Sequence, residues 1–466
     1  MINFLDLGGP FLTELHEHYK KLSFISNEIS NEEMKDNNSN EVKKNEYKSI
    51  VFDGSISYEW CSFLTNYFDE YNKYTLHDGD FINLSNKKII FETTSLSRAT
   101  PTFITKQNII SFDYISFDWL NICYAYLDTN YKTSKNEELK LYIKGLFENY
   151  LPKIIEFIIN NKLKNIDFCI NKNFIAKNMI NLFNAFLPDF DFTDIKIGRR
   201  NYGYVPRIDI VKNQTLSIFI FCSSWIMNLL TNFLIKNKIE KAIGDIFKSD
   251  DLKGPIFDYY LDENNSFTLW NTIFNEEKYP NPSFKKNTVY YYGHDFVYNI
   301  ENFKYIYVFQ KLIQSSIPIF FFGKNCSGLS SIINQSLNEL VNKHKIIKQI
   351  KIKMTYNTNT NQIEKEINTK MDKILRRVYG DRYQRQTLVF IDDVHLCKRN
   401  NNFNEYMRYL LNEKLTYDNK ENMIRYYNDL NIVNSGNYFN NLLGNNQFDD
   451  NNNEKEDFIR YMNQFS

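Results

Sequence analysis

Residues 317–331 read IPIFFFGKNCSGLSS, in which an apolar run leads into Gly323, Gly328 follows, and a helix-like stretch begins at Ser330. This is the frame G-x-x-x-x-G-K-[ST] of a phosphate-binding loop, with Leu329 standing at the lysine position. Such a loop requires a strand before it and a helix after it. The segment therefore predicts an α/β nucleotide-type fold whose pocket lacks its ammonium group.

A second apolar run, LVFIDDVH, ends in Asp392 and Asp393. A strand that ends in paired carboxylates is typical of a site that holds Mg²⁺ and orients a water molecule. We expect Asp392 to hold the metal, directly or through water. Asp393 stands where a glutamate usually polarises the attacking water, and its side chain is one methylene shorter. The alternative is an ordinary solvated strand end.

The two glycines can supply the backbone shape that wraps a β-phosphate at a helix N-terminus. Ser330 is placed to ligate Mg²⁺, and we count the neighbouring hydroxyl of Ser331 with it. Leu329 cannot bridge the β- and γ-phosphates as a lysine would. We therefore expect ATP or ADP with Mg²⁺ to bind weakly or not at all at this degenerate site.

The bulk composition excludes several classes of protein. The 466 residues include 56 basic and 56 acidic side chains, so no net charge favours nucleic acid or an anionic membrane. Cysteines and histidines are scattered without metal-ligand spacing, which argues against zinc. The N-terminus has no signal-peptide pattern. Residues 216–235 are uncharged and long enough to span a bilayer, but interspersed polar residues favour a buried core helix or strand-plus-helix.

Strand and helix signals alternate along most of the chain. We predict strands at 49–54 (SIVFDG), 88–93 (KIIFET), 109–114 (IISFDY), 317–322, 349–354 and within LVFIDD, with mostly helical spacing over 118–246. Polar, Asn-rich stretches at 27–47 and 442–456 predict disorder, and 355–362 predicts a loop. The fold class is therefore α/β, with parallel sheets and flanking helices. SIVFDG resembles LVFIDD, so the architecture is expected twice.

Several segments, taken in order, resemble dynein heavy chains. The runs VFDGSISYEW, LHDGDFINL and IIFETTSLSRATPTFITK are similar to the second AAA+ module of that family, and FDWL to the start of its helical lid. FDYYLDE with Trp270 resembles the connection to the third module. VYNIENFKYIYVFQKLI, the glycine loop and LVFIDDVHL are similar to that third module. The resemblance is collinear over about residues 48 to 418.

The resemblance implies two partial P-loop AAA+ modules joined by a helical lid. Its boundaries are 1–125 for the C-terminal part of one large α/β subdomain, with 27–47 an insertion. The lid covers 126–250 and a connecting segment 251–300. The N-terminal part of the next α/β subdomain covers 301–466, with a tail at 442–466. The chain is expected to be a fragment of a longer polypeptide.

The family is a microtubule-based motor with six AAA+ modules in a ring, so the resemblance implies a cytoplasmic and cytoskeletal location. Partners would be the rest of the ring, dynein intermediate and light chains and, indirectly, microtubules, without nucleic acid or membrane. The paired aspartates at 392 and 393 favour the axonemal type, in a cilium or flagellum, over the cytoplasmic type.

Two further positions bear on the second module. Asp53 ends its strand and is followed by Gly54 where a catalytic acid would stand, which agrees with a module that does not turn nucleotide over. Lys106 falls where the family has an arginine that reaches the neighbouring nucleotide. Lysine brings charge there but not a planar fork.

Three functions stay open at this point. The first is a non-catalytic or regulatory part of a dynein ring that transmits ATP-driven conformational change. The second is a self-standing AAA+ ATPase, which needs the missing lysine and an arginine finger. The third is an Asn-rich interaction scaffold without nucleotide binding. We expect no hydrolysis by this chain alone.

Overall fold

The computed structural model describes part of the chain, with gaps. The described residues are 2–3, 48–53, 56, 58, 61, 64–68, 73–75, 81–83, 87–93, 96–111, 118–131, 137–161, 170–187, 208–231, 235–247, 254–274, 296–323, 327–343, 347–396, 403–418 and 423–437. The stretches 27–47 and 442–456, for which the sequence predicts disorder, lie outside these residues, as do 112–114.

The N-terminal part contains a small parallel sheet in the order β1 (Ile2–Asn3), β2 (Lys48–Asp53) and β5 (Lys87–Glu92). The strands predicted at 49–54 and 88–93 are therefore present. Stacked rings of Phe52 and Phe91, 5.2 Å apart, join β2 to β5, and Phe91 also packs edge-on against Phe103 of α3 (Pro101–Thr105). A hairpin of β3 (Lys73–Thr75) and β4 (Phe81–Asn83) and the short η3 (Thr65–Phe68) lie between the two longer strands in sequence.

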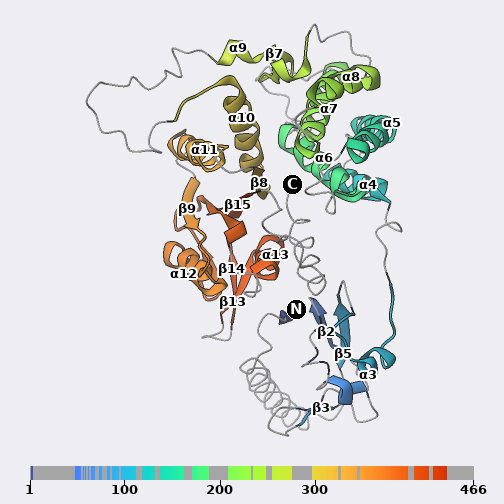
Figure 1. Ribbon diagram of the computed structural model, residues 1–466, viewed down its shortest axis with the longest axis vertical. Helices are drawn as coiled ribbons and strands as arrows, with labels where there is room; N and C mark the ends of the chain where they lie inside the picture. Colours follow the sequence, from blue (N-terminus) through green and yellow to red (C-terminus); the bar gives the residue numbers. More distant parts are fainter. Residues whose placement is uncertain are drawn as a thin grey trace, which may run out of the picture.

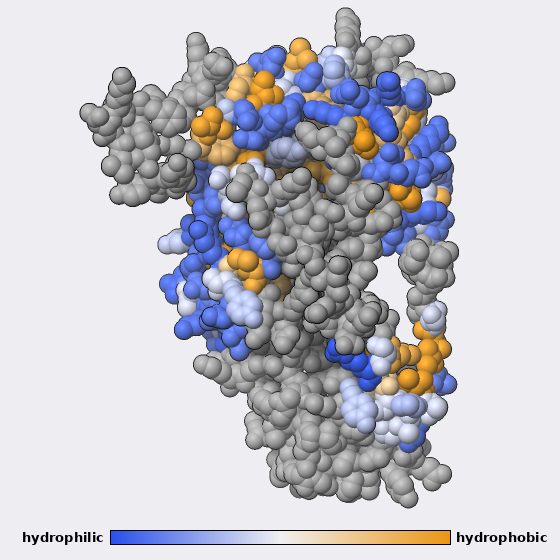
Figure 2. Space-filling model, viewed as in Figure 1, coloured by the Kyte–Doolittle hydropathy of each residue, from blue (hydrophilic) through white to orange (hydrophobic). Residues whose placement is uncertain are grey.

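The strand predicted at 109–114 is wrong for the residues that are described. Residues 108–111 have no regular structure, and Ile109 and Ile110 are 56% and 76% exposed. An apolar run forms a strand only where another strand completes its hydrogen bonds, and no described strand pairs with this one. Figure 2 shows hydrophobic surface at the lower right, over the region of β5 and α3.

The middle of the chain is helical, as its spacing predicts (Figure 1). Its helices are α4 (Trp119–Asn130), α5 (Glu137–Asn161), α6 (Lys172–Phe186), α7 (Ile208–Leu230) and α8 (Lys236–Phe247). Asp118 and Asn171 cap α4 and α6 by accepting hydrogen bonds from backbone N–H groups. Phe147, Phe183 and Phe219 bring α5, α6 and α7 together, with ring centroids 5.7 to 6.0 Å apart.

Helix α7 contains residues 216–230, most of the uncharged stretch that is long enough to span a bilayer. It is a core helix, because Ile218 to Met227 are buried against the other helices. The hydroxyls of Ser223, Ser224 and Thr231 donate to carbonyls three or four residues earlier, so they are satisfied without water. Neither α7 nor any other helix in the described part of the chain meets the length and hydropathy that a bilayer crossing requires.

A short aromatic connection follows the helices. It consists of η8 (Ile256–Asp258), the hairpin β6 (Tyr259–Leu261) and β7 (Phe267–Leu269), and α9 (Trp270–Ile273). Trp270 is buried between Tyr260 and two rings of α10 (Ile300–Gln314), those of Phe303 and Tyr307. Tyr307 also contacts Phe186 of α6, with 5.9 Å between ring centroids. Helix α10 therefore packs on both the helical layer and the connection.

The last part of the chain is built on a parallel sheet in the order β8 (Ile319–Gly323), β15 (Leu430–Asn437), β12 (Gln386–Asp392) and β9 (Ile347–Lys353). Helix α11 (Leu329–Lys343) follows β8, and α12 (Thr360–Lys370) follows β9. The sequence predicts three of these strands. It predicts a loop over 355–362, but the loop ends at Asn359, which forms a capping box with Gln362 and starts α12.

A second, smaller sheet that the sequence did not predict lies beside α12 and α13 (Figure 1). Its strands run in the order β10 (Asp372–Leu375), β11 (Val378–Gly380), β14 (Met423–Tyr427) and β13 (Leu415–Asp418). Between β12 and β13 the chain forms η9 (Val394–Leu396) and α13 (Phe403–Glu413). Asp381, just after β11, accepts two hydrogen bonds from Arg385 and pairs with Lys348 of β9, which ties this sheet to the larger one.

Candidate functional site

The carboxyl ends of neighbouring strands meet at one edge of the larger sheet. Gly323, the last residue of β8, pairs in register with Asn437 of β15, and Asp392, the last residue of β12, pairs with Lys353 of β9. The sheet order inserts β15 between the strand of the glycine loop and the strand of the aspartate pair. Ligands of open parallel sheets bind at this edge, where the loops leave the strands.

The glycine loop connects β8 to α11, as the sequence predicts. Gly328 has a φ of +77°, a conformation that costs a side-chain-bearing residue free energy. A Cβ at Gly323 would lie 3.2 Å from the Ser327 hydroxyl, so the loop closes tightly over the strand end. Residues 324–326 lie outside the described part. Both glycines therefore occupy positions that suit a compact anion-binding turn.

Ser330 and Asp392 meet although they are far apart in sequence. The Ser330 hydroxyl, in the first turn of α11, donates to Asp392 Oδ1 at 2.8 Å. Asp392 is only 5% exposed, and its Oδ1 accepts hydrogen bonds from both α11 and β15. Ser331, the other predicted hydroxyl, is exposed. A hydroxyl and a carboxylate oxygen are the hard ligands that Mg²⁺ prefers, so these two residues fit that ion.

Ser435 belongs to the same cluster, and sequence reasoning missed it. Its hydroxyl donates to Asp392 Oδ1 at 2.5 Å and accepts from the backbone N–H of Asp393 at 3.2 Å. Ser435 is buried near the end of β15. Residues 431–437 of that strand, NIVNSGN, are too polar to predict a central strand. The sequence offered little signal for it, because the strand that carries Ser435 was itself not predicted.

Asp393 turns the chain out of the sheet. Its φ of 59° lies in the left-handed region, which Asp tolerates better than most residues. Burial, and next the charge of Asp392, raise the pKa of its carboxyl, while His395 and Lys353 act in the opposite direction. Burial also lowers the pKa of His395. The two aspartates are therefore distinct: hydroxyl groups fix the buried carboxylate of Asp392, whereas Asp393 is only partly buried.

Leu329 is the first residue of α11, directly before Ser330. Its side chain is half-buried and packs against the main hydrophobic core. One of its methyl groups would lie 3.8 Å from a Cβ added at Gly323, so the apolar group sits at the mouth of the loop. The pocket therefore keeps the residues that suit Mg²⁺ and the loop shape that suits phosphate, and has a hydrocarbon at the position of the cation.

The remaining predicted site residues lie elsewhere. Asp53 ends β2 and pairs in register with Glu92 of β5, and Lys106 caps α3 and donates to the Thr65 carbonyl at 3.4 Å. Figure 1 shows β2 of the N-terminal sheet and the nearby helix α3 well apart from β8. The structure therefore brings Gly323, Gly328, Ser330 and Asp392 together and leaves Asp53 and Lys106 outside that group.

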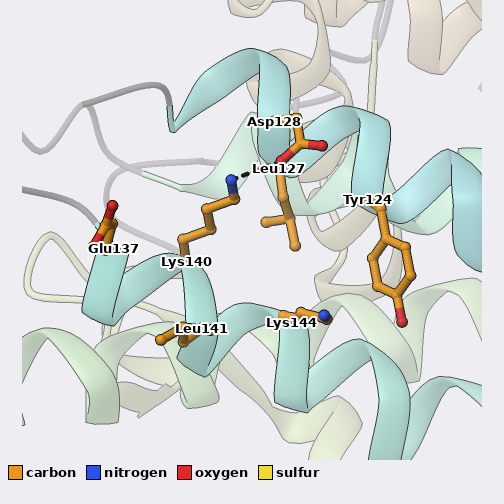
Figure 3. Close-up of a pocket in the computed structure, with 7 residues that line it drawn as sticks. All are labelled: Tyr124, Leu127, Asp128, Glu137, Lys140, Leu141 and Lys144. Atoms are coloured by element: carbon orange, nitrogen blue, oxygen red, sulfur yellow. Dashed lines mark ion pairs between the residues drawn. The ribbon is translucent and has the colours of Figure 1, made fainter. Parts of the chain in front are cut away.

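A cavity of about 440 Å³ opens between α4 and α5 of the helical layer. Figure 3 shows its lining residues, which are Tyr124, Leu127, Asp128, Glu137, Lys140, Leu141 and Lys144. Lys140 pairs with Asp128 at 2.6 Å, and Lys144 lies 3.8 Å from Glu148. Both lysines are thus paired within the protein, and none of the predicted site residues lines this cavity.

Comparison with known families accounts for both the helical layer and the glycine-loop sheet. Residues 143–272 match the dynein heavy chain AAA lid domain, and residues 284–440 match the P-loop containing dynein motor region. The observed α/β fold with a parallel sheet flanked by helices fits P-loop AAA+ modules with a lid, which confirms the predicted fold class. The P-loop motor region implies nucleotide binding in general.

Similar proteins are dynein heavy chains from distant organisms. "Dynein heavy chain-like protein 2" of Plasmodium falciparum is 25% identical over 353 residues, which are 75% of this chain and 6% of that protein. "Dynein axonemal heavy chain 5" of Rattus norvegicus is 21% identical over 363 residues, 76% of this chain and 10% of the relative. "Dynein axonemal heavy chain 12" of Homo sapiens is 21% identical over 378 residues, which are 75% of this chain and 11% of that protein.

The matches thus span three quarters of this chain but only about a tenth or less of each relative. The family models and the relatives agree with the resemblance seen in the residues themselves. Together they confirm that this chain resembles part of a dynein heavy chain, its AAA lid domain and its P-loop containing motor region.

Proposed function

We propose that this chain is a part of a dynein motor ring whose glycine-loop module, residues 301–466, does not hydrolyse ATP and instead transmits conformational change. The observation that carries the proposal is Leu329 at the mouth of the loop, beside an otherwise intact Ser330–Asp392 pair. Losing the ammonium removes a charge-assisted contact to the β- and γ-phosphates on which transfer depends. The remaining residues preserve the shape of the pocket.

Ser330 and Asp392 would hold Mg²⁺, which supplies positive charge to the phosphate oxygens when it is bound. Asp393 would be the group that orients water. Its backbone turns away at φ 59°, and its side chain is shorter than the glutamate usual at that position. A weak base and a missing cation favour slow or absent turnover. The role left to the module is regulatory.

The contacts of α10 support transmission between the helical layer and the loop helix. Glu339 of α11 accepts hydrogen bonds from Tyr298 and, at 3.0 Å, from Gln310 of α10. On its other side α10 packs through Tyr307 against Phe186 of α6. Packed elements of this kind carry strain better than loops do, because interiors are dense and compress little. A shift of α11 would therefore act on α6 through α10.

The same proposal assigns the rest of the chain. Residues 1–125, 126–250 and 251–300 would be the end of the preceding α/β subdomain, its lid and the connection. The preceding module would not hydrolyse nucleotide either, because Gly54 follows Asp53 where a second acid is needed. Lys106 would offer charge toward a neighbouring nucleotide. The axonemal relatives favour a place in the cytoskeleton of a cilium or flagellum, with the ring, intermediate and light chains as partners and microtubules contacted indirectly.

Phosphate release measured with the full 466-residue chain tests the proposal. We expect no release above background from the wild-type chain with MgATP. Steady release that Asp392→Ala abolishes would instead establish the self-standing ATPase. An interaction scaffold would be indicated if limited proteolysis released no compact fragment containing residues 257–430. An antibody against residues 300–430 should detect a native polypeptide several-fold longer than this chain.

A further inference from the structure

The side chains of the edge strand β9 alternate between the two faces of the sheet. Ile350 and Ile352 are buried in the core, whereas Lys351 and Lys353 are exposed. The register pairs Ile352 with Ile391 and Lys353 with Asp392. Since paired residues of parallel strands project to the same side of a sheet, Lys353 lies on the face where Asp392 meets Ser330. Lys353 is therefore the register neighbour of Asp392, on the adjacent strand and on the same face.

The reach of the Lys353 side chain suits a role at the site. Adjacent strands lie about 4.8 Å apart, and the lysine has a flexible four-carbon stem. The other described base at this edge, His395, is held toward its neutral form by burial. Lys348, at the start of the same strand, is engaged 3.3 Å from Asp381.

We propose that Lys353 supplies the positive charge that Leu329 does not, and so allows this site to take the terminal phosphate of a nucleoside triphosphate. This rests on the proposed function, because it assumes that the pocket is of the nucleotide type. It adds that binding is retained through a charge from β9 rather than from the loop. Such a charge reaches the phosphate from the side of Asp393, not from the helix N-terminus. Lys353 would thus support nucleotide binding without restoring the loop contact that accelerates phosphoryl transfer.

Equilibrium titration of the full chain with a fluorescent ATP analogue and Mg²⁺ tests the inference. Lys353→Met should weaken binding by at least about tenfold, since a charge-assisted contact to phosphate is lost. Lys353→Arg should retain most of the affinity. Lys351→Met, on the same face two residues earlier, is the matched control and should bind as the wild type does. The double variant Leu329→Lys, Lys353→Met should recover the lost affinity.

Two results would overturn the inference. One is equal affinity of the wild type and Lys353→Met. The other is no binding by the wild type at millimolar analogue together with binding by Leu329→Lys. Either would leave the proposed non-hydrolysing role intact, because that role fails only if the wild-type chain releases phosphate. Circular dichroism spectra of each variant would separate loss of binding from loss of folding.

Discussion

The Ser435 hydroxyl donates a hydrogen bond of 2.5 Å to Asp392, which joins the ends of β15 and β12 inside the candidate site. It also accepts from the Asp393 N–H, so one buried oxygen fixes both aspartates. Ser435→Ala should lower the free energy of unfolding by about 1.5–3 kcal/mol, the usual worth of a hydrogen bond to a charged group. Urea denaturation measures this. The exposed Ser331→Ala is the control, and an equal effect of both would contradict the assignment.

Asp393 should make stability depend on pH in a predictable direction. Its pKa is raised in the folded chain, so stability is lost as pH rises from the ordinary carboxyl range through the raised pKa. Asp393→Asn should remove that loss, and Asn tolerates the left-handed backbone. We expect the variant to be more stable than wild type at pH 7, by about 1 kcal/mol or less. The difference should vanish near about pH 3. A gap that widens as pH falls would refute the shift.

Gly328 and Gly244 should respond to alanine with opposite signs. Gly328 has φ +77°, so Gly328→Ala should cost about 1–2 kcal/mol of stability through backbone strain. Gly244 lies on an exposed face of α8 with nothing within 4 Å of an added Cβ. Gly244→Ala should therefore add about 0.5–1 kcal/mol, because alanine favours the helix. Thermal melting compares the two, and a stabilised Gly328→Ala would show that the loop does not need its glycine.

Asp381 should contribute stability that disappears in acid. Arg385 donates to it from Nε at 2.8 Å and Nη2 at 2.9 Å, and these bonds hold the pKa of the Asp381 carboxyl well below its usual range. Stability is then present above the unfolded-state pKa and is lost as pH falls through the folded one. Asp381→Asn should cost about 1–2 kcal/mol at pH 7, because Asp381 is buried but Arg385 is partly exposed and solvent screens the pair. The penalty should shrink toward about pH 2.

A matched control for that experiment is Asp372→Asn. Asp372 lies 3.6 Å from Arg382, whose side chain is 78% exposed, and Asp372 itself is 39% exposed. Such a pair contributes under about 1 kcal/mol, and salt screens it. Equal penalties for the two variants, measured by urea denaturation at pH 7, would mean that the Asp381 pair does not stabilise the junction between β11 and β12.

Apolar strands next to glycine or paired acids could be predicted from the sequence because hydrophobic runs and their turn residues carry most of the local signal. This holds for β2, β8 and β12, whereas β5 and β9 were predicted from their hydrophobic residues alone. The glycine loop and its relation to Asp392 followed from the same reasoning, since parallel strands end at one edge. The helical layer followed from its 3.6-residue spacing.

Other elements depend on pairing that composition does not reveal. Strand β15 carries Asn431, Asn434 and Ser435, all buried, because the flanking strands β8 and β12 supply its backbone partners. The β10–β11 hairpin is rich in lysine and arginine and still forms, since β14 completes it. The run IISFDY shows the reverse case, in which hydrophobic residues 109–111 have no strand to pair with. Ser435 was not predicted as a site residue because the polar composition of β15 gave no strand signal.

The seven paired positions between β9 and β12 have a further effect on folding. A slip of β9 by a single residue would carry Ile352 to the site edge and push the Lys353 ammonium into the apolar interior. An unpaired buried charge would destabilise the misaligned sheet. The alternation of isoleucine and lysine therefore selects the correct register. The lysines of β9 therefore also help to set the register between β9 and β12.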